Sequence, residues 1–133
     1  MPNIPVLPII SSVTFVNATI TRGVDLNPGS TYYSFQMTYN IGLSTQVKYL
    51  DAVGSFSSVP VWINTTSLTA TNLVPNTLFS VRLAAATDAI GTGDTGFGPP
   101  ATFTTAAAQP IFQPFSSIYS TMITANWNPN FNT

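Results

Sequence analysis

The chain has 133 residues, of which 44% are hydrophobic and only 5% are charged, and its formal net charge is −1. This length accommodates one ordinary domain and a short additional segment. Its three basic residues, Arg22, Lys48 and Arg82, are too few to bind a run of phosphates, so we expect no nucleic-acid partner. The chain contains no cysteine for disulfides and no apolar run long enough for membrane insertion as a helix.

Alternation of apolar and polar residues recurs between turn signals and predicts a succession of short β-strands. The clearest alternation covers residues 33–39, whose aromatic and methionine side chains are expected to face the core. It follows a turn at residues 27–30, in which Pro28 fixes φ and Gly29 is expected to supply a positive φ. Further strands are expected at residues 47–49, 59–63, 68–73, 79–85 and 101–105. Because Pro60 has no N–H to donate, the strand at 59–63 is predicted to lie at a sheet edge.

The spacing of these strands predicts an all-β fold, a two-sheet antiparallel β-sandwich formed by residues 1–109. Residues 106–110 are expected to be a short linker, and residues 118–127 bring new strand-forming sequence. Too few residues follow for a second core. We therefore expect residues 110–133 to be a strand-forming extension, which either opens a following module or contacts another subunit.

Three features occur in a characteristic order along the chain. Residues 67–81 carry the run Leu73-Val74-Pro75-Asn76-Thr77, residues 98–105 end in two threonines after a glycine-rich loop, and residues 118–129 alternate up to Trp127. This order resembles fibronectin type III domains, with strand E and its corner, strand F, strand G, and then strand B of a following module. The resemblance implies an immunoglobulin-like sandwich in an extracellular or cell-surface protein.

Two positions depart from the pattern of that family. Phe79 stands where the family usually has a tyrosine, so a hydrogen bond of about 1 kcal/mol is expected to be missing. Arg22 stands where the second copy has Trp127, and Trp62 comes too late in the chain to replace it. We therefore expect the first module to lack part of its core, which a strand from a neighbour is able to supply.

The chemistry available to the chain is limited to four carboxylates, because it has neither histidine nor cysteine. We predict no enzyme activity, no catalytic residue, no cofactor and no metal. Asp88 and Asp94 are an alternative calcium pair, but their spacing fits no calcium-loop pattern. The glycines at 91–98 precede two prolines and a strand rather than a helix, which favours a long hairpin loop with positive-φ positions over a phosphate site.

Two kinds of short motif in the sequence suggest surface features. The segment Arg22-Gly23-Val24-Asp25 is not the Arg-Gly-Asp tripeptide, because the inserted valine changes the separation of the charges, and it is interpreted as a turn. Asn17 and Asn64 begin triplets that fit N-glycosylation, so both are possible glycosylation sites in a cell that glycosylates secreted proteins.

The leading prediction for function is a non-catalytic structural or adhesive module, a repeat unit or subunit of a cell-surface fibre that assembles through its C-terminal strands. Its partners are copies of itself or neighbouring modules. The alternative is a spacer or carbohydrate-contacting module of a secreted polysaccharide-degrading enzyme, although core packing accounts for most of the aromatic residues. The expected inter-subunit contacts are Ile111, Phe112, Phe115, Ile118, Ile123 and Trp127.

Overall fold

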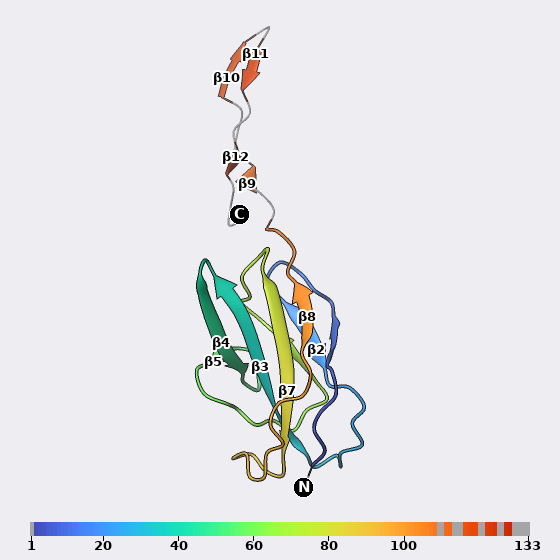
Figure 1. The fold of residues 1–133 in the computed structure, drawn as a ribbon. Helices are drawn as coiled ribbons and strands as arrows, with labels where there is room; N and C mark the ends of the chain where they lie inside the picture. The colour runs from blue at the N-terminus through green and yellow to red at the C-terminus, as the bar shows by residue number, and fades with distance from the viewer. Residues whose placement is uncertain (1, 109–110, 113–115, 120–121, 125–126, 129–133) are drawn as a thin grey trace.

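A computed structural model of the chain describes residues 2–108, 111–112, 116–119, 122–124 and 127–128 (Figure 1). All regular secondary structure in these residues is β-strand. A search of the same residues found no helix with the length and apolar character needed to cross a membrane.

Two antiparallel sheets form the sandwich (Figure 1). One sheet has the order β1-β2-β6, with strands Ile9–Ser11, Ala18–Thr21 and Ser67–Ala70. The other has the order β5-β4-β3-β7-β8, with strands Phe56–Ser57, Ser44–Leu50, Tyr32–Ile41, Leu78–Ala86 and Ala101–Thr104. The predicted all-β, two-sheet antiparallel sandwich is therefore confirmed.

The core lies between the sheets and is formed by the alternating positions that the sequence indicated. Phe79 in β7 is fully buried between Tyr39 of β3 and Phe103 of β8, with ring centroids 4.9 and 5.4 Å away. From the other sheet, Ile20 and Leu68 close the core. Burying each large side chain of this set stabilises the fold by roughly 1.5–3 kcal/mol, which is why the alternation fixes the register of the strands.

The prediction of a strand at residues 59–63 is wrong, because no strand forms there. The edge strand is β5, which lies earlier in the chain and places Phe56 against Tyr39 at a centroid distance of 5.6 Å. Within residues 59–63, Ile63 forms an isolated bridge to Tyr33 through two backbone hydrogen bonds of 2.8 and 2.9 Å. The chain is crossing from one sheet to the other here, and Pro60 has no N–H with which to extend a ladder.

The turn before β3 exists, but its predicted cause is wrong. The N–H of Thr31 donates to the carbonyl of Pro28 at 3.0 Å, whereas Gly29 does not adopt a positive φ. The left-handed residue of this loop is Leu26, with a φ of 62°. The glycine-rich loop after β7 does follow the prediction, because Gly91, Gly93 and Gly96 all have positive φ.

Candidate interaction surface

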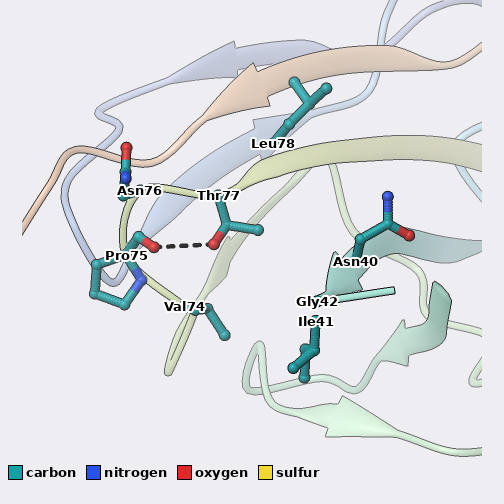
Figure 2. A pocket seen from close by; sticks show the side chains of 8 residues that line it. All are labelled: Asn40, Ile41, Gly42, Val74, Pro75, Asn76, Thr77 and Leu78. Atoms are coloured by element: carbon teal, nitrogen blue, oxygen red, sulfur yellow. Dashed lines mark hydrogen bonds between the residues drawn. The ribbon is translucent and has the colours of Figure 1, made fainter. Parts of the chain in front are cut away.

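The loop between β6 and β7 meets the end of β8 at one end of the sandwich. Thr105 is buried, and its hydroxyl donates to the carbonyl of Val74 at 2.7 Å and accepts from the N–H of Thr77 at 3.0 Å. Thr77 in turn donates its hydroxyl to the carbonyl of Pro75 at 2.9 Å (Figure 2). The corner expected to lack a tyrosine hydrogen bond at Phe79 is therefore held by threonine hydroxyls.

A shallow groove of about 360 Å³ lies beside this corner (Figure 2). One wall comes from the end of β3 and the turn that follows it, and the other from the β6–β7 loop and the first residue of β7. Ile41 and Leu78 are 56% and 61% exposed, and Leu43 next to the groove is fully exposed. We call the groove and Leu43 together the exit surface. Its lining residues are Asn40, Ile41, Gly42, Val74, Pro75, Asn76, Thr77 and Leu78.

The exit surface contains no titratable side chain, so it is suited to contact rather than to acid–base chemistry. A second groove lies on the far side of Val74 and Pro75, where Phe15 is exposed. The two grooves share those two residues. Apolar side chains therefore surround the corner on both sides.

The chain leaves the sandwich at this same end. The N–H of Ala106 donates to the carbonyl of Thr14 at 3.1 Å, its carbonyl accepts from the N–H of Asn76 at 3.1 Å, and Ala108 is buried. Residues 106–108 are thus fixed to the sandwich, which corrects the prediction that the linker begins at residue 106. The end of β8 and the β6–β7 loop together set the point from which the C-terminal segment departs (Figure 1).

The C-terminal segment forms paired strands. The strand β9 (Ile111–Phe112) pairs antiparallel with β12 (Trp127–Asn128), and β10 (Ser116–Tyr119) pairs antiparallel with β11 (Met122–Thr124). Because β10 and β11 lie between β9 and β12 in the sequence, the four strands follow the course of one hairpin. Among the described residues, neither pair has a third strand beside it.

The six predicted contact residues fall almost entirely in these strands. Ile111 and Phe112 lie in β9, Ile118 in β10, Ile123 in β11 and Trp127 in β12, while Phe115 lies outside the described residues. Phe112 and Trp127 are direct partners in the register. The expected strand pair is therefore present, and contact with another subunit stays a prediction, as does the boundary between residues 109 and 110.

The opposite end of the sandwich carries a buried polar cluster built around Arg22. The Arg22 guanidinium lies over the ring of Tyr33, with its central carbon 4.6 Å from the centroid, and donates to the Tyr33 hydroxyl at 2.6 Å. That hydroxyl donates to a carboxylate oxygen of Asp25 at 2.7 Å, and Arg22 lies 3.6 Å from the other oxygen. Arg22 therefore packs onto the buried ring of Tyr33, and core supplied by a neighbour at this position stays a prediction.

Burial raises the pKa of the Tyr33 hydroxyl above its ordinary value of 10.0, and the hydrogen bond to the Asp25 carboxylate raises it further. Both effects favour the protonated phenol, which donates to the carboxylate. The segment interpreted as a turn between Arg22 and Asp25 is instead an irregular loop. Its acid points inward to organise the cluster.

Asp88 and Asp94, the alternative calcium pair, each close a turn of their own. Asp88 accepts from the N–H groups of Ile90 and Thr92 at 3.1 and 3.0 Å, and Asp94 accepts from the N–H of Gly96 at 3.0 Å. A side-chain hydrogen bond from Thr92, followed by backbone hydrogen bonds from Thr92, Ile90 and Gly91, lowers the pKa of Asp88 below its ordinary value of 3.8. Within the described residues, no group of three or more potential metal ligands comes together.

The two possible glycosylation sites differ in their surroundings. The side-chain nitrogen of Asn64 donates to the carbonyls of Gly29 and Thr31 at 2.7 and 2.9 Å, so a glycan attached there would replace one of these hydrogen atoms. The backbone N–H of Asn17 donates to the Thr14 hydroxyl at 2.9 Å. Modification of either asparagine stays a prediction.

Solved structures resemble the chain over most of its length. A fibronectin type III domain of human fibronectin type III domain containing protein 3 is 16% identical, with 80% of this chain and 88% of that chain covered and a TM-score of 0.58. The FN5 domain of Drosophila Lar is 15% identical, with 81% and 100% covered and a TM-score of 0.53. A redesigned β-sandwich protein is 24% identical, with 82% and 100% covered and a TM-score of 0.52. Neither a protein-family model nor a curated protein matches the sequence.

The sheet order and these similarities define the class as an immunoglobulin-like antiparallel sandwich. Within that class, the chain has the fold of a fibronectin type III domain. The corner residues and the threonine ending that suggested this family are the ones that meet at Thr105. The sequence analysis did not assign a role to Thr105. The available signal was its position, because continuing the alternation of β8 past the exposed Thr104 turns the Thr105 side chain inward.

Proposed function

We propose that this chain is a non-catalytic, extracellular or cell-surface structural module, a repeat unit or subunit of a fibre that assembles through its C-terminal strands. The observation that carries the proposal is the ribbon formed by β9–β12, which has no third strand among the described residues. A two-stranded hairpin alone is at best marginally stable in water, whereas addition to a partner stabilises it.

The composition supports contact between copies. Residues 109–133 contain no charged residue, and the whole chain has only seven. Like-charge repulsion between copies is therefore small. The carboxylates of the sandwich support a non-catalytic role, because Asp25, Asp51 and Asp88 are each engaged by hydrogen bonds that shape loops.

The carbohydrate-contacting alternative receives less support. A sugar platform needs several aromatic rings on one exposed face. Within residues 2–108, Phe15 is the exposed aromatic side chain, and it lies near the exit surface rather than on a sheet face.

Deletion of all residues after Gln109 tests the proposal. Within residues 2–108 the buried hydrophobic side chains form a core that extends from Ala18 to Ala108, so the shortened chain is expected to fold. Sedimentation and electron microscopy should find concentration-dependent assembly of the full chain and a folded monomer after the deletion. Normal polymerisation of the shortened chain, or a full chain that stays monomeric at high concentration, contradicts the proposal. Retention on an insoluble polysaccharide that is lost in Phe15→Ser would favour the alternative.

A further inference from the structure

Three aliphatic side chains are presented to solvent at the end of the sandwich opposite the exit surface. Val24 and Leu26 are each 88% exposed on the loop before β3, and Ile90 is 85% exposed on the loop after β7. The two loops flank the same end, because Tyr32 at the start of β3 pairs with Ala86 at the end of β7. We call Val24, Leu26 and Ile90 the loop-end surface.

In the first of these loops the charged side chain is buried and the apolar side chains are exposed. Asp25 is 8% exposed, while the valine and leucine on either side of it point to solvent. Leu26 also has a φ of 62°, a left-handed conformation that is unfavourable for a bulky residue. Leucine contributes nothing to the core at this position, and asparagine or glycine would adopt the backbone more readily. Backbone strain that presents an apolar side chain to water is typical of a contact site.

Hydrogen bonds and close packing fix both loops. The N–H of Arg22 donates to the carbonyl of Thr66 at 2.9 Å, and the N–H of Asn27 donates to Asp25 at 3.1 Å. In the second loop, Asp88 accepts two backbone N–H groups, and Gly91 lies so close to Trp62 that a Cβ there would be 2.5 Å from the indole nitrogen. The exposed aliphatic residues are therefore held in place before any partner binds.

The complementary element of the chain leaves from the other end. Figure 1 shows the N-terminus and the β7–β8 loop at one end of the sandwich and β9–β12 beyond the other. The C-terminal strands include Ile111, Phe112, Ile118, Ile123 and Trp127 and carry no charge. Strands that depart from one end do not reach the loop-end surface of their own sandwich, but those of a second copy can.

We propose that the loop-end surface of one copy binds the C-terminal strands β9–β12 of the next. This deepens the proposed function and rests on it. The two surfaces are different patches at opposite ends of one chain, so the contact is head-to-tail and each copy leaves a free surface of each kind. Repetition of this contact gives a filament whose two ends are different. Because the contact is apolar, added salt does not dissociate it.

The test uses the full chain with the double substitution Val24→Ser and Leu26→Asn. Asparagine tolerates the left-handed conformation, so the free energy of unfolding measured in urea should equal that of the unaltered chain. The control is Val53→Ser, at a residue 75% exposed between β4 and β5 and outside both the loop-end surface and the C-terminal strands. Sedimentation equilibrium at low and high salt measures self-association.

We expect the double substitution to weaken self-association at least about tenfold at either salt concentration, and Val53→Ser to leave it unchanged. A folded double variant that assembles as tightly as the unaltered chain overturns the inference. Weakening by Val53→Ser of equal size also overturns it, because the effect would not be specific to the loop end. If deletion after Gln109 abolishes assembly while the double variant assembles normally, the proposed function stands and this acceptor surface fails.

Discussion

The hydroxyl of Thr105 donates a hydrogen bond of 2.7 Å to the carbonyl of Val74. The same oxygen accepts the N–H of Thr77 at 3.0 Å, and the N–H of Thr105 donates to the carbonyl of Thr77 at 3.0 Å. One buried residue therefore joins the segment that follows β8 to the loop that precedes β7. This is also where the chain turns away from the sandwich, so Thr105 both stabilises the corner and fixes the root of the C-terminal strands.

Substitution Thr105→Val should lower the free energy of unfolding by about 1–3 kcal/mol. Valine keeps the shape but removes the buried hydroxyl that pairs with the Val74 carbonyl and the Thr77 N–H. Urea denaturation measures the change. The matched control is Thr104→Val, at an exposed position of β8, which should change stability by less than about 0.5 kcal/mol. Equal effects of the two substitutions would mean that the hydroxyl of Thr105 is not what holds the corner.

The sequence predicted the elements that depend on side-chain alternation. The buried apolar face of β3 and of the first half of β7 follows directly from it, because one face of each strand must be apolar to form the core. Alternation did not predict that Ser34 and Gln36, on the other face of β3, are buried as well. It did not predict contacts that depend on tertiary placement. Whether Arg22 finds a ring and a carboxylate depends on how a loop folds over Tyr33. The start of β5 depends on where Phe56 meets Tyr39, which no local pattern indicates.

Substitution Tyr33→Phe should lower the free energy of unfolding by about 1–3 kcal/mol, because it removes the donor to the buried Asp25 carboxylate. Tyr32→Phe, at the adjacent half-buried position, is the control and should have a small effect. Urea denaturation of both variants at neutral pH makes the comparison. A Tyr33→Phe protein as stable as the unaltered chain would contradict a structural role for the cluster.

The same variant should alter the dependence of stability on pH. Since the pKa of Tyr33 in the folded state lies above the ordinary value of 10.0, the protonated hydroxyl contributes fully below about pH 10. That contribution is lost as the pH rises through the folded pKa. Burial also raises the pKa of Tyr39, but Tyr39 is present in both proteins. The unaltered chain should therefore lose more stability than Tyr33→Phe as the pH rises above about 10. Parallel plots of unfolding free energy against pH for the two proteins would contradict a raised pKa of Tyr33.

Two glycines should respond in opposite directions to substitution by alanine. Gly54 has a φ of 83°, and a Cβ there would lie 1.7 Å from the carbonyl oxygen of Thr69. Gly54→Ala should therefore destabilise the fold by more than about 2 kcal/mol. At Gly29, φ is not positive and nothing lies within 4 Å of the added Cβ, so Gly29→Ala should be neutral or stabilise by about 0.4–1 kcal/mol. Thermal unfolding distinguishes these outcomes, and a severe loss of stability in Gly29→Ala would instead support a positive φ at Gly29.

The loop that presents Ile90 should loosen in acid. Hydrogen bonds from Thr92 are the main cause that lowers the pKa of Asp88 below 3.8. Because the folded pKa is depressed, the contribution of this carboxylate to the loop is present above the unfolded pKa and is lost as the pH falls through the folded value. The backbone amide chemical shifts of Ile90 and Thr92 should titrate together with a midpoint below 3.8. In Asp88→Asn the charge-assisted bonds are replaced by weaker neutral ones, so the same amides should show no such titration. A midpoint at or above 3.8 in the unaltered chain would contradict the hydrogen bonds that fix the loop, and with them the fixed position of Ile90.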